Sequence, residues 1–189
     1  MPPRLLDAAR EAGLPVMPTY GMTESASQIA TARDGGRWAE PLPGVELRLG
    51  DAAEILVRGP MVAPGALGRD GWLHTGDAGS LDELGRLHVR GRLKDLIVTG
   101  GENVSPVEVE QALLEHPAVA DAGVVGLPDP EWGEAVSAFV VLGAAATAEE
   151  LQSHCRERLA PYKVPKRIEQ VRALPRNAAG KLLRAEIAT

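Results

Sequence analysis

Hydrophobic and polar positions follow one spacing in the first half of the chain and another in the second half. Residues 45–49 and 54–57 alternate between apolar and polar side chains, and a Gly-Asp turn signal separates them. This alternation is typical of half-buried strands. After the Gly- and Pro-rich segment 59–71, residues 87–89 continue the pattern. The first half is therefore predicted to form short antiparallel strands that curl into a barrel or a meander.

The N-terminal end adds one short helix. The apolar residues of 5–12, Ala12 included, have the spacing of one helix face, and Gly13 is placed to end the helix. An extended segment from Val16 then leads into Tyr20-Gly21-Met22-Thr23-Glu24. We interpret that segment as a polar loop at the end of a strand, where ligands bind in open α/β sheets, or as a helix N-terminus capped by Thr23. The two interpretations are compatible.

Beyond residue 92 the spacing becomes that of helices alternating with strands. Two capping boxes, Ser105 with Glu108 and Thr147 with Glu150, predict the starts of two helices. Apolar runs predict strands over 122–127, 135–142 and 167–171. This second region is predicted to be a small α+β domain of a size that can fold alone.

Residues 91–103 connect the two regions. The segment runs from charged residues through a short apolar strand into Gly100-Gly101, and then toward the helix that starts at Ser105. It is either an ordinary β-turn-α connection or a loop whose backbone passes close to a ligand. We predict the domain boundary at residues 92–94, which divides the chain into 1–92 and 93–189.

Composition and charge narrow the class of protein. The formal net charge is −6 and the basic residues are scattered, which argues against nucleic acid or an anionic membrane surface as the main partner. Cys155 is the only cysteine, so no disulfide can form within the chain, and its place on an apolar helix stripe predicts a core residue. No stretch has the apolar length of a membrane span and no signal peptide is recognised. We expect a soluble, cytoplasmic protein.

Four polar clusters have residue types suited to a nucleotide, and they lie at 20–24, 75–77, 91–95 and 175–181. Tyr20 offers a flat face to a base, Thr23 could donate to a phosphate oxygen, and Glu24 could hold Mg²⁺, which prefers carboxylate and phosphate oxygens. Asp77 could accept hydrogen bonds from ribose hydroxyls, and Lys181 could bring a compact positive charge to a transferring group. Each cluster alone is a weak signal. Their order and spacing together are a strong one.

These clusters resemble the motifs of the adenylate-forming superfamily, which includes acyl-CoA synthetases, luciferases and the adenylation domains of peptide synthetases. The family's aromatic-Gly-x-Thr-Glu, Thr-Gly-Asp, Gly-Arg-x-Lys/Asp and Gly-Lys motifs are matched at 20–24, 75–77, 91–94 and 180–181. The resemblance covers essentially the whole chain. It implies an α+β fold in which residues 1–92 are the end of a large domain with short strands and a β-barrel-like subdomain. Residues 93–189 would be the small, mobile C-terminal lid over AMP.

The resemblance also implies an ATP-dependent, AMP-forming ligase. A carboxylate attacks the α-phosphate of ATP to give an acyl-adenylate and pyrophosphate, and the thiol of coenzyme A then displaces AMP. The residues implied in binding the nucleotide and Mg²⁺ are Tyr20 with Gly21 near the adenine, Thr23 at a phosphate, Glu24 on Mg²⁺, and Asp77 and Arg92 at the ribose.

The same resemblance assigns roles in the second region. Lys181 would reach the α-phosphate and carboxylate oxygens during adenylation and offset the developing charge. Lys94 would be the hinge about which the small domain turns between the two half-reactions. This domain alternation would withdraw Lys181 and bring Gly100 and Gly101 to the site, where the lack of side chains leaves room for pantetheine.

Ser27 and Gln28 narrow the class of acid that the ligase would use as its substrate. A Ser-Gln pair shortly after Thr-Glu is similar to the o-succinylbenzoate–CoA ligases of menaquinone biosynthesis, and such a polar pair suits a substrate with a second carboxylate. The pair could instead lie in a helix turn without a ligand. A fatty or aromatic acyl-CoA ligase, and an enzyme that loads a carrier protein, are the alternatives.

One family feature has no match in the sequence. Adenylate-forming enzymes carry an upstream Ser/Thr/Gly-rich loop that cradles the β and γ phosphates. We therefore expect the chain to be about half of such a ligase or less, and to be inactive unless it pairs with a partner polypeptide. Apolar surface left exposed on 1–92 would favour association, for example as a homodimer.

Overall fold

The computed structural model describes residues 3–33, 36, 38–178 and 180–187. It divides into two compact units, Met1–Lys94 and Asp95–Thr189, which we call unit 1 and unit 2 and describe separately. The division follows Lys94, and the sequence predicted a boundary at residues 92–94. Within the described residues, no helix is long and apolar enough to span a bilayer.

Unit 1 begins with α1 (Pro3–Glu11), close to the helix expected over 5–12. Gly13 follows its end with a φ of 68°, a left-handed conformation that glycine adopts without a steric penalty. Ala9 is buried, whereas Ala12 is exposed. The expectation that Ala12 shares the apolar face is wrong, because this residue lies beyond the end of the helix.

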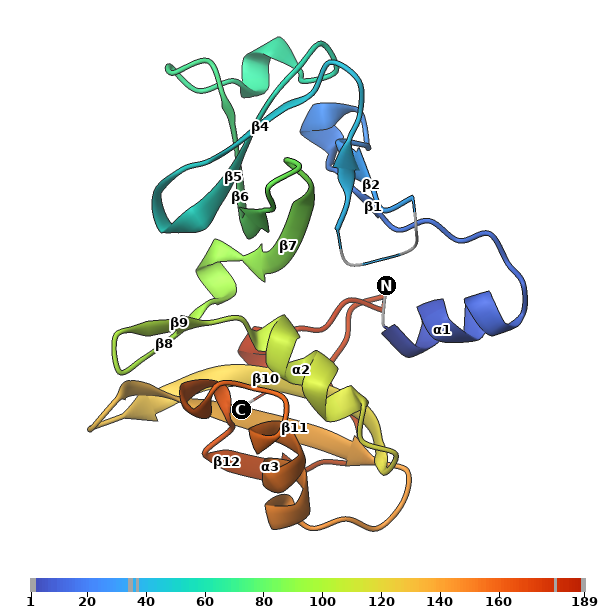
Figure 1. Ribbon diagram of the computed structural model, residues 1–189. Helices are drawn as coiled ribbons and strands as arrows, with labels where there is room; N and C mark the ends of the chain where they lie inside the picture. The colour runs from blue at the N-terminus through green and yellow to red at the C-terminus, as the bar shows by residue number, and fades with distance from the viewer. Residues whose placement is uncertain (1–2, 34–35, 37, 179, 188–189) are drawn as a thin grey trace. The chain divides into compact units, whose positions relative to one another are not determined.

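Two antiparallel sheets follow in unit 1 (Figure 1). The first has three short strands, β1 (Thr19–Tyr20), β2 (Ala30–Thr31) and β3 (Glu40–Pro41). The second has four strands, β4 (Glu46–Leu49), β5 (Glu54–Arg58), β6 (Leu73–Leu81) and β7 (Leu87–Arg92), each paired with the next along the chain. Of the two arrangements expected, this is the meander. The described strands do not close into a barrel.

The core of unit 1 joins the two sheets. Ile55 and Val57, at alternate positions of β5, pack with Leu73 of β6, Leu87 of β7 and Ile29, which precedes β2. Burial of each such side chain contributes roughly 1.5–3 kcal/mol. Because this core holds the segment around β1 and β2 against the meander, it fixes the ends of β1 and β6 relative to each other.

Unit 2 alternates strands and helices. Its elements are β8 (Ile97–Thr99), β9 (Glu102–Val104), α2 (Pro106–Leu114), β10 (Val119–Asp129), β11 (Gly133–Leu142), α3 (Ala148–Arg156) and β12 (Arg167–Gln170). The sheet has the order β10-β11-β8-β9, and β12 pairs with β11 in parallel. The expected α+β fold, with its two helices and its strands near 122–127, 135–142 and 167–171, is confirmed.

Apolar residues at alternate positions of β10 and β11 form the floor of the unit 2 core. These residues are Ala122 and Val124 of β10 and Val136, Ala138 and Val140 of β11. Leu113 of α2 and Leu151 and Cys155 of α3 pack in the same core, so both helices lie on one face of the sheet (Figure 1). Burial raises the pKa of the Cys155 thiol to about 11. The prediction that this cysteine belongs to the core is confirmed.

The two predicted capping boxes have different outcomes. In α3, the Thr147 hydroxyl accepts the N–H of Glu150 at 3.2 Å, and the Glu150 carboxylate accepts the N–H of Thr147 at 2.7 Å. In α2, Ser105 occupies the N-cap position but its side chain accepts no capping hydrogen bond. Glu108 instead binds Nζ of Lys163 at 2.7 Å, so this box is replaced by an ion pair from a distant part of the chain.

Gly100 and Gly101 do not form a β-turn-α connection, which was one of the two interpretations of this segment. Strands β8 and β9 pair with Thr99 opposite Glu102, so the two glycines are the turn of a β-hairpin. Their φ angles are 58° and 84°, as in a type I′ turn, which needs positive φ at both central residues. Helix α2 begins only after this hairpin.

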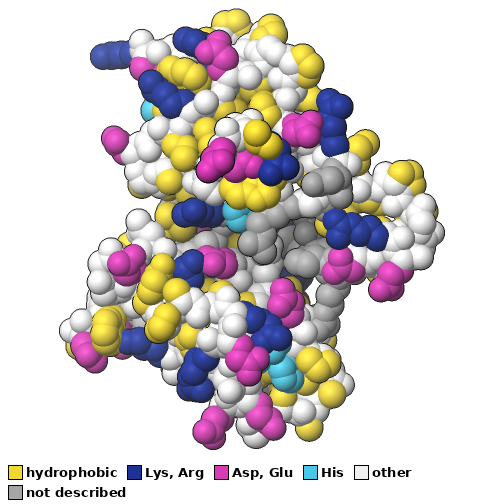
Figure 2. Space-filling view, viewed as in Figure 1, with side chains coloured by type: hydrophobic (Ala, Val, Ile, Leu, Met, Phe, Trp, Pro, Cys, Tyr) yellow, Lys and Arg dark blue, Asp and Glu magenta, His cyan; other side chains and the backbone are white. Residues whose placement is uncertain are grey.

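Charged side chains of both signs are interspersed on the visible face in Figure 2. Many of them form exposed ion pairs, such as Arg58 with Glu46 and Arg167 with Glu169. Exposed pairs of this kind add little to stability, because water and salt screen the attraction. The pattern on this face agrees with the scattered charge of the sequence.

Candidate functional site

Asp77 is the centre of a hydrogen-bonded group in unit 1. Its Oδ2 accepts the hydroxyl of Tyr20 at 2.8 Å, and its Oδ1 lies 2.9 Å from Nε of Arg92. Arg92 also donates from Nη1 to the backbone oxygen of Thr75 at 3.2 Å. Three residues expected at the nucleotide, which come from β1, β6 and β7, therefore meet in one place. We call Tyr20, Asp77 and Arg92 the aspartate cluster.

The Thr-Gly-Asp segment is anchored to β5. The hydroxyl of Thr75 donates to the backbone oxygen of Ile55 at 2.7 Å and accepts the N–H of Asp77 at 3.1 Å. The N–H of Gly76 donates to the Glu54 carboxylate at 2.9 Å. The Thr75 hydroxyl therefore holds the motif against β5, and Asp77 is the residue whose side chain the motif contributes to the aspartate cluster.

Tyr20 is held in its protonated form. Burial raises the pKa of its phenol, and the hydrogen bond to Asp77 acts in the same direction, while contact with Thr75 acts against it. The phenol therefore donates to Asp77 across the physiological pH range. Its ring position is fixed by this bond and by partial burial against the unit 1 core.

The chain after Tyr20 turns sharply, but Thr23 does not cap the turn. Thr23–Ser25 is a single 3-10 turn with Met22 at the N-cap position. The buried Ser25 hydroxyl accepts the N–H of Met22 at 3.2 Å and donates to its backbone oxygen at 3.0 Å. The expectation of a Thr23 cap is therefore wrong, because Ser25 closes the turn. Thr23 and Glu24 are exposed.

Glu24 is an exposed carboxylate that could serve as one of several Mg²⁺ ligands. Within the part of the chain that the structure describes, its carboxylate has no ion-pair partner, and no group of at least three His, Cys, Asp or Glu side chains could hold a metal alone. Protein-bound Mg²⁺ often takes one or two carboxylates and completes its shell with water and substrate phosphates. One exposed carboxylate fits this mode, in which the phosphates supply the remaining ligands.

Ser27 and Gln28 lie in a strained bend and not in a helix turn. Ala26 and Ser27 have φ angles of 51° and 82° although neither is glycine, which is uncommon and costs roughly 1–3 kcal/mol per residue. The side-chain amide of Gln28 donates to the Thr31 hydroxyl at 2.6 Å. The bend carries the backbone of Ser27 directly past Gly21, so the two candidate substrate residues adjoin the first motif.

Lys94 and the glycine hairpin are exposed. Lys94 lies in the 3-10 turn Leu93–Asp95 at the division between the units. The N–H of Gly100 donates to the backbone oxygen of Trp132 at 2.9 Å, and Nζ of Lys166 lies 3.6 Å from the centre of the Trp132 ring. The contact of Trp132 with the glycine hairpin was not predicted from the sequence. The available signal was a large aromatic side chain in the polar turn between two predicted strands.

Lys181 lies on a short, hydrogen-bonded loop in unit 2. Arg176 and Leu182 form an isolated antiparallel bridge. Between them, the N–H of Lys181 donates to Oδ1 of Asn177 at 2.9 Å, and the N–H of Asn177 donates to the Lys181 oxygen at 3.0 Å. The Lys181 side chain is exposed and forms no ion pair with the described residues. We call the described residues of 175–183 the lysine loop.

Comparison with known proteins identifies the chain's relatives. Residues 108–181 match the family described as the AMP-binding enzyme C-terminal domain. The 2-succinylbenzoate–CoA ligase of Bacillus cereus is 46% identical over 210 residues, an alignment that covers 98% of this chain and 44% of the ligase. The chain therefore spans less than half the length of the curated relatives it matches.

Solved structures show the same likeness. The o-succinylbenzoate CoA synthetase of Bacillus subtilis, in complex with the acyl-adenylate intermediate, matches with a TM-score of 0.88 and 41% identity, covering 100% of this chain and 44% of the synthetase. The amide bond synthetase McbA of Marinactinospora thermotolerans matches with a TM-score of 0.84 and 38% identity, over 98% of this chain and 44% of that protein.

Proposed function

We propose that this chain, whose residues 108–181 match the AMP-binding enzyme C-terminal domain family, is part of an ATP-dependent, AMP-forming acyl-CoA ligase. The observation that carries the proposal is the aspartate cluster. A buried carboxylate held between a phenol and a guanidinium fits the two hydroxyls of a ribose, as acidic residues do in other nucleotide sites. The Tyr20 ring beside it provides a face for the adenine.

In the first half-reaction, a substrate carboxylate attacks the α-phosphate of ATP and pyrophosphate leaves. The Thr23 hydroxyl would donate to a phosphate oxygen, and Glu24 would hold Mg²⁺, which would neutralise phosphate charge when bound. Lys181 places its ammonium on the oxygens of the reacting carboxylate and α-phosphate. Its hydrogen-bonded loop and exposed side chain support this role, because a preorganised charge needs no rearrangement when charge develops.

In the second half-reaction, the thiol of coenzyme A attacks the acyl carbonyl and AMP leaves. We propose that unit 2 turns about Lys94 between the two steps, withdrawing Lys181. The hairpin turn Gly100-Gly101 would then border the pantetheine arm. Its two glycines are exposed and present only backbone, which suits close approach by a narrow chain.

We propose o-succinylbenzoate as the acyl substrate, which would place the ligase in menaquinone biosynthesis. Support comes from the names of the relatives and from the polar pair Ser27 and Gln28 beside Gly21. A fatty or aromatic acyl-CoA ligase, or a carrier-loading enzyme, is the second candidate, because the likeness to an amide bond synthetase shows that similarity to this chain extends to proteins named for other reactions. The third is that the chain by itself is inactive.

ATP–pyrophosphate exchange tests the activity. The 189-residue chain, and a fusion in which it replaces the matching part of the Bacillus subtilis synthetase, should be offered o-succinylbenzoate, a fatty acid and a benzoate. We expect exchange by the fusion with o-succinylbenzoate and none by the chain alone. Exchange with another acid would replace the substrate assignment, and a well-folded fusion without exchange would refute the proposed function.

Two substitutions in the fusion test the roles of the lysines. Lys181→Ala should abolish most adenylation while thioester formation from added acyl-adenylate continues, with Arg167→Gln, an exposed change in the same unit, as the control. An equal loss in both steps would contradict the role of Lys181. Lys94→Pro should hold one domain orientation and slow one half-reaction far more than the other. Unchanged kinetics would place the hinge elsewhere.

Location and association can each be tested directly. We propose a cytoplasmic protein that binds a small carboxylic acid and coenzyme A, and neither nucleic acid nor membrane; cell fractionation should recover it in the cytosol. Leu14, Met17 and Leu84 of unit 1 are 56%, 54% and 78% exposed, so we propose self-association of the isolated chain through unit 1. Light scattering during size-exclusion chromatography should detect it, and a monomer at high concentration would contradict it.

A further inference from the structure

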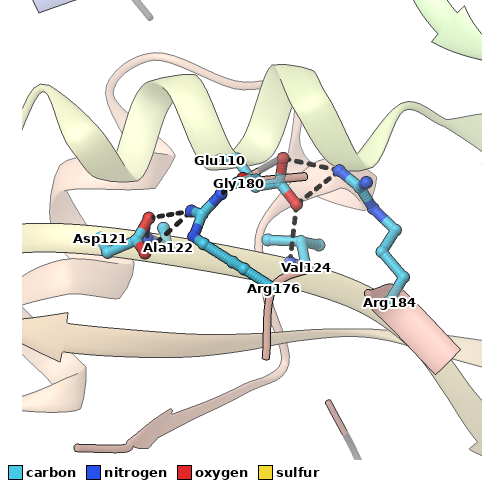
Figure 3. Close-up of polar contacts among 7 residues, drawn as sticks. All are labelled: Glu110, Asp121, Ala122, Val124, Arg176, Gly180 and Arg184. Atoms are coloured by element: carbon cyan, nitrogen blue, oxygen red, sulfur yellow. Dashed lines mark hydrogen bonds and ion pairs between the residues drawn. The ribbon is translucent and has the colours of Figure 1, made fainter. Parts of the chain in front are cut away.

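Arg176 fastens the N-terminal stem of the lysine loop to strand β10. Its Nη2 lies 2.8 Å from each carboxylate oxygen of Asp121 in β10. Its Nη1 donates to the backbone oxygen of Gly180 at 2.8 Å. One guanidinium therefore joins both the fixed strand and the residue that precedes Lys181 (Figure 3).

Arg184 fastens the C-terminal stem in the same way. Its Nη2 lies 2.7 Å from both carboxylate oxygens of Glu110 in α2. The same carboxylate accepts the N–H of Val124 at 2.9 Å. Strand β10 lies at the edge of its sheet, so Glu110 ties together the strand edge, helix α2 and the segment after Lys181, as Figure 3 shows.

A glycine of β10 leaves room for residues that flank the loop to pack against the strand. A side chain added at Gly123 of β10 would place Cβ 2.9 Å from Cδ1 of Ile187 and 3.2 Å from Cδ2 of Leu174. Leu174 is buried. The segment that carries Lys181 is therefore held against β10 and α2 at three points, one apolar and two ionic.

We propose that Arg176 and Arg184 are positioning residues for Lys181, because their ion pairs with Asp121 and Glu110 fix both stems of the lysine loop on unit 2. The proposal rests on the proposed function, since it assigns these arginines to the delivery of the adenylating lysine. The arginines themselves would touch neither ATP nor the acid. Their contribution is the orientation of the loop between them.

The chemistry of the pairs favours a geometric role. In both pairs one guanidinium nitrogen, Nη2, contacts both carboxylate oxygens, and such charge-assisted hydrogen bonds are short and fix the position of the side chain. A buried ion pair is weak evidence for stability, because desolvation offsets much of the attraction. The Arg184 pair carries such a cost: among the described residues its buried Nε has no hydrogen-bond partner, and burial raises the pKa of Glu110 to about 7. We attribute this costly ion pair between Arg184 and Glu110 to the position that it imposes on the lysine loop.

The first arm of the test measures protection of the loop in the 189-residue chain. Hydrogen–deuterium exchange at pH 8, where Glu110 is mainly ionised, would be followed on peptides across the lysine loop. Arg176→Gln and Arg184→Gln should each speed exchange there by about tenfold or more, as expected from loss of a charged hydrogen-bonded pair. Arg158→Gln, which removes an exposed pair with Glu115, is the control and should leave the loop unchanged.

The second arm measures the two half-reactions in the fusion. The same variants should lower kcat for adenylation by about tenfold or more, as loss of orientation at a catalytic charge does, with little change in KM for ATP. Thioester formation from added acyl-adenylate should be unaffected. The double variant Asp121→Arg with Arg176→Asp rebuilds the ion pair with exchanged charges and should recover part of the loss.

The outcomes separate this proposal from the function on which it rests. Exchange in the loop that matches the Arg158→Gln control would overturn the positioning role. So would an equal fall in both half-reactions, which would show that the arginines only stabilise unit 2. If the unsubstituted fusion adenylates no acid, the proposed function fails. The hydrogen–deuterium exchange arm still decides the structural part: faster exchange in the arginine variants means that the arginines hold the loop, and unchanged exchange means that they do not.

Discussion

Replacing Gly21 by alanine should disrupt the segment that carries the first motif. A Cβ at this position would lie 2.1 Å from the backbone oxygen of Ser27, 2.5 Å from its carbonyl carbon and 2.7 Å from Cα of Gln28. All three neighbours are backbone atoms, so no side-chain rotation relieves the clash. The opposing segment is already strained at Ala26 and Ser27.

The cost of this clash follows from overpacking in other proteins. Such changes typically cost about 1–3 kcal/mol and occasionally more, and an immovable neighbour favours the upper end. For a unit of this size, about 3 kcal/mol corresponds to a fall in Tm of more than roughly 10 °C. Because Gly21 follows Tyr20, the distortion should also separate the Tyr20 hydroxyl from Asp77.

The assay uses tryptophan fluorescence during thermal unfolding. In a Trp132→Phe background, the remaining tryptophans, Trp38 and Trp72, both belong to unit 1, so the signal reports that unit alone. Gly65→Ala is the matched control, because a Cβ there meets no atom within 4 Å. A Gly21→Ala variant that unfolds at the temperature of the Gly65→Ala variant would refute the reasoning.

Three further outcomes follow from unit 2. The Cys155 thiol, with its pKa raised by burial to about 11, should react with a disulfide reagent at pH 8 at least about 100-fold more slowly in the folded chain than in urea, and equal rates would contradict its burial. Thr147→Ala should lower the free energy of unfolding of unit 2 by about 1 kcal/mol through loss of the capping box, measured by urea titration against Ser153→Ala, whose effect it should exceed. Burial raises the pKa of Glu110 from 4.5 to about 7, so between these values the folded state retains a proton that the unfolded state loses. The unfolding free energy should therefore fall as pH rises from 4.5 to about 7, and Glu110→Gln should remove that part of the slope.

Sequence patterns correctly predicted structural features whose partners lie within a few residues of each other along the chain. The capping box of Thr147 and Glu150 forms as expected because both partners lie within one helix turn. The equivalent box at Ser105 fails because Glu108 finds Lys163, which lies 55 residues away along the chain. Only the folded unit 2 brings that lysine close, so residue spacing around Ser105 contains no sign of the competition.

The glycine hairpin shows a limit of a different kind. Strand β9 has only three residues, Glu102–Val104, and two of them are exposed. Short polar segments lack the apolar alternation that identifies strands. The strand forms because β8 presents a pairing edge and the glycines permit the tight turn. Of the two interpretations of this segment, the β-turn-α connection is therefore wrong, and the close approach of its backbone to a ligand stays a prediction.

In the candidate site too, the sequence predicted the residues of local motifs but not the contacts between residues far apart in the chain. The residues of the aspartate cluster were named from their motifs, but their direct contacts were not, because Tyr20 and Asp77 are 57 residues apart. The partners of Arg176 and Arg184 lie 55 and 74 residues away. Neither arginine was singled out, since an isolated arginine in a polar segment has the appearance of a solvated surface residue. Motifs locate groups that act on ligands, whereas the residues that hold those groups are found through tertiary contacts.

The contacts of Asp77 constrain how its carboxylate serves the proposed ribose site. One oxygen accepts the Tyr20 hydroxyl and the other faces Arg92, while an ionised carboxylate has about four acceptor positions. About two positions therefore remain for the ribose hydroxyls, and their directions depend on where Tyr20 and Arg92 hold the carboxylate. With the Asp77 side chain only 8% exposed, it has little freedom to turn. In the proposed site, Tyr20 therefore serves both parts of the nucleoside. Its ring provides a face for the adenine, and its hydroxyl orients the Asp77 carboxylate that accepts the ribose hydroxyls.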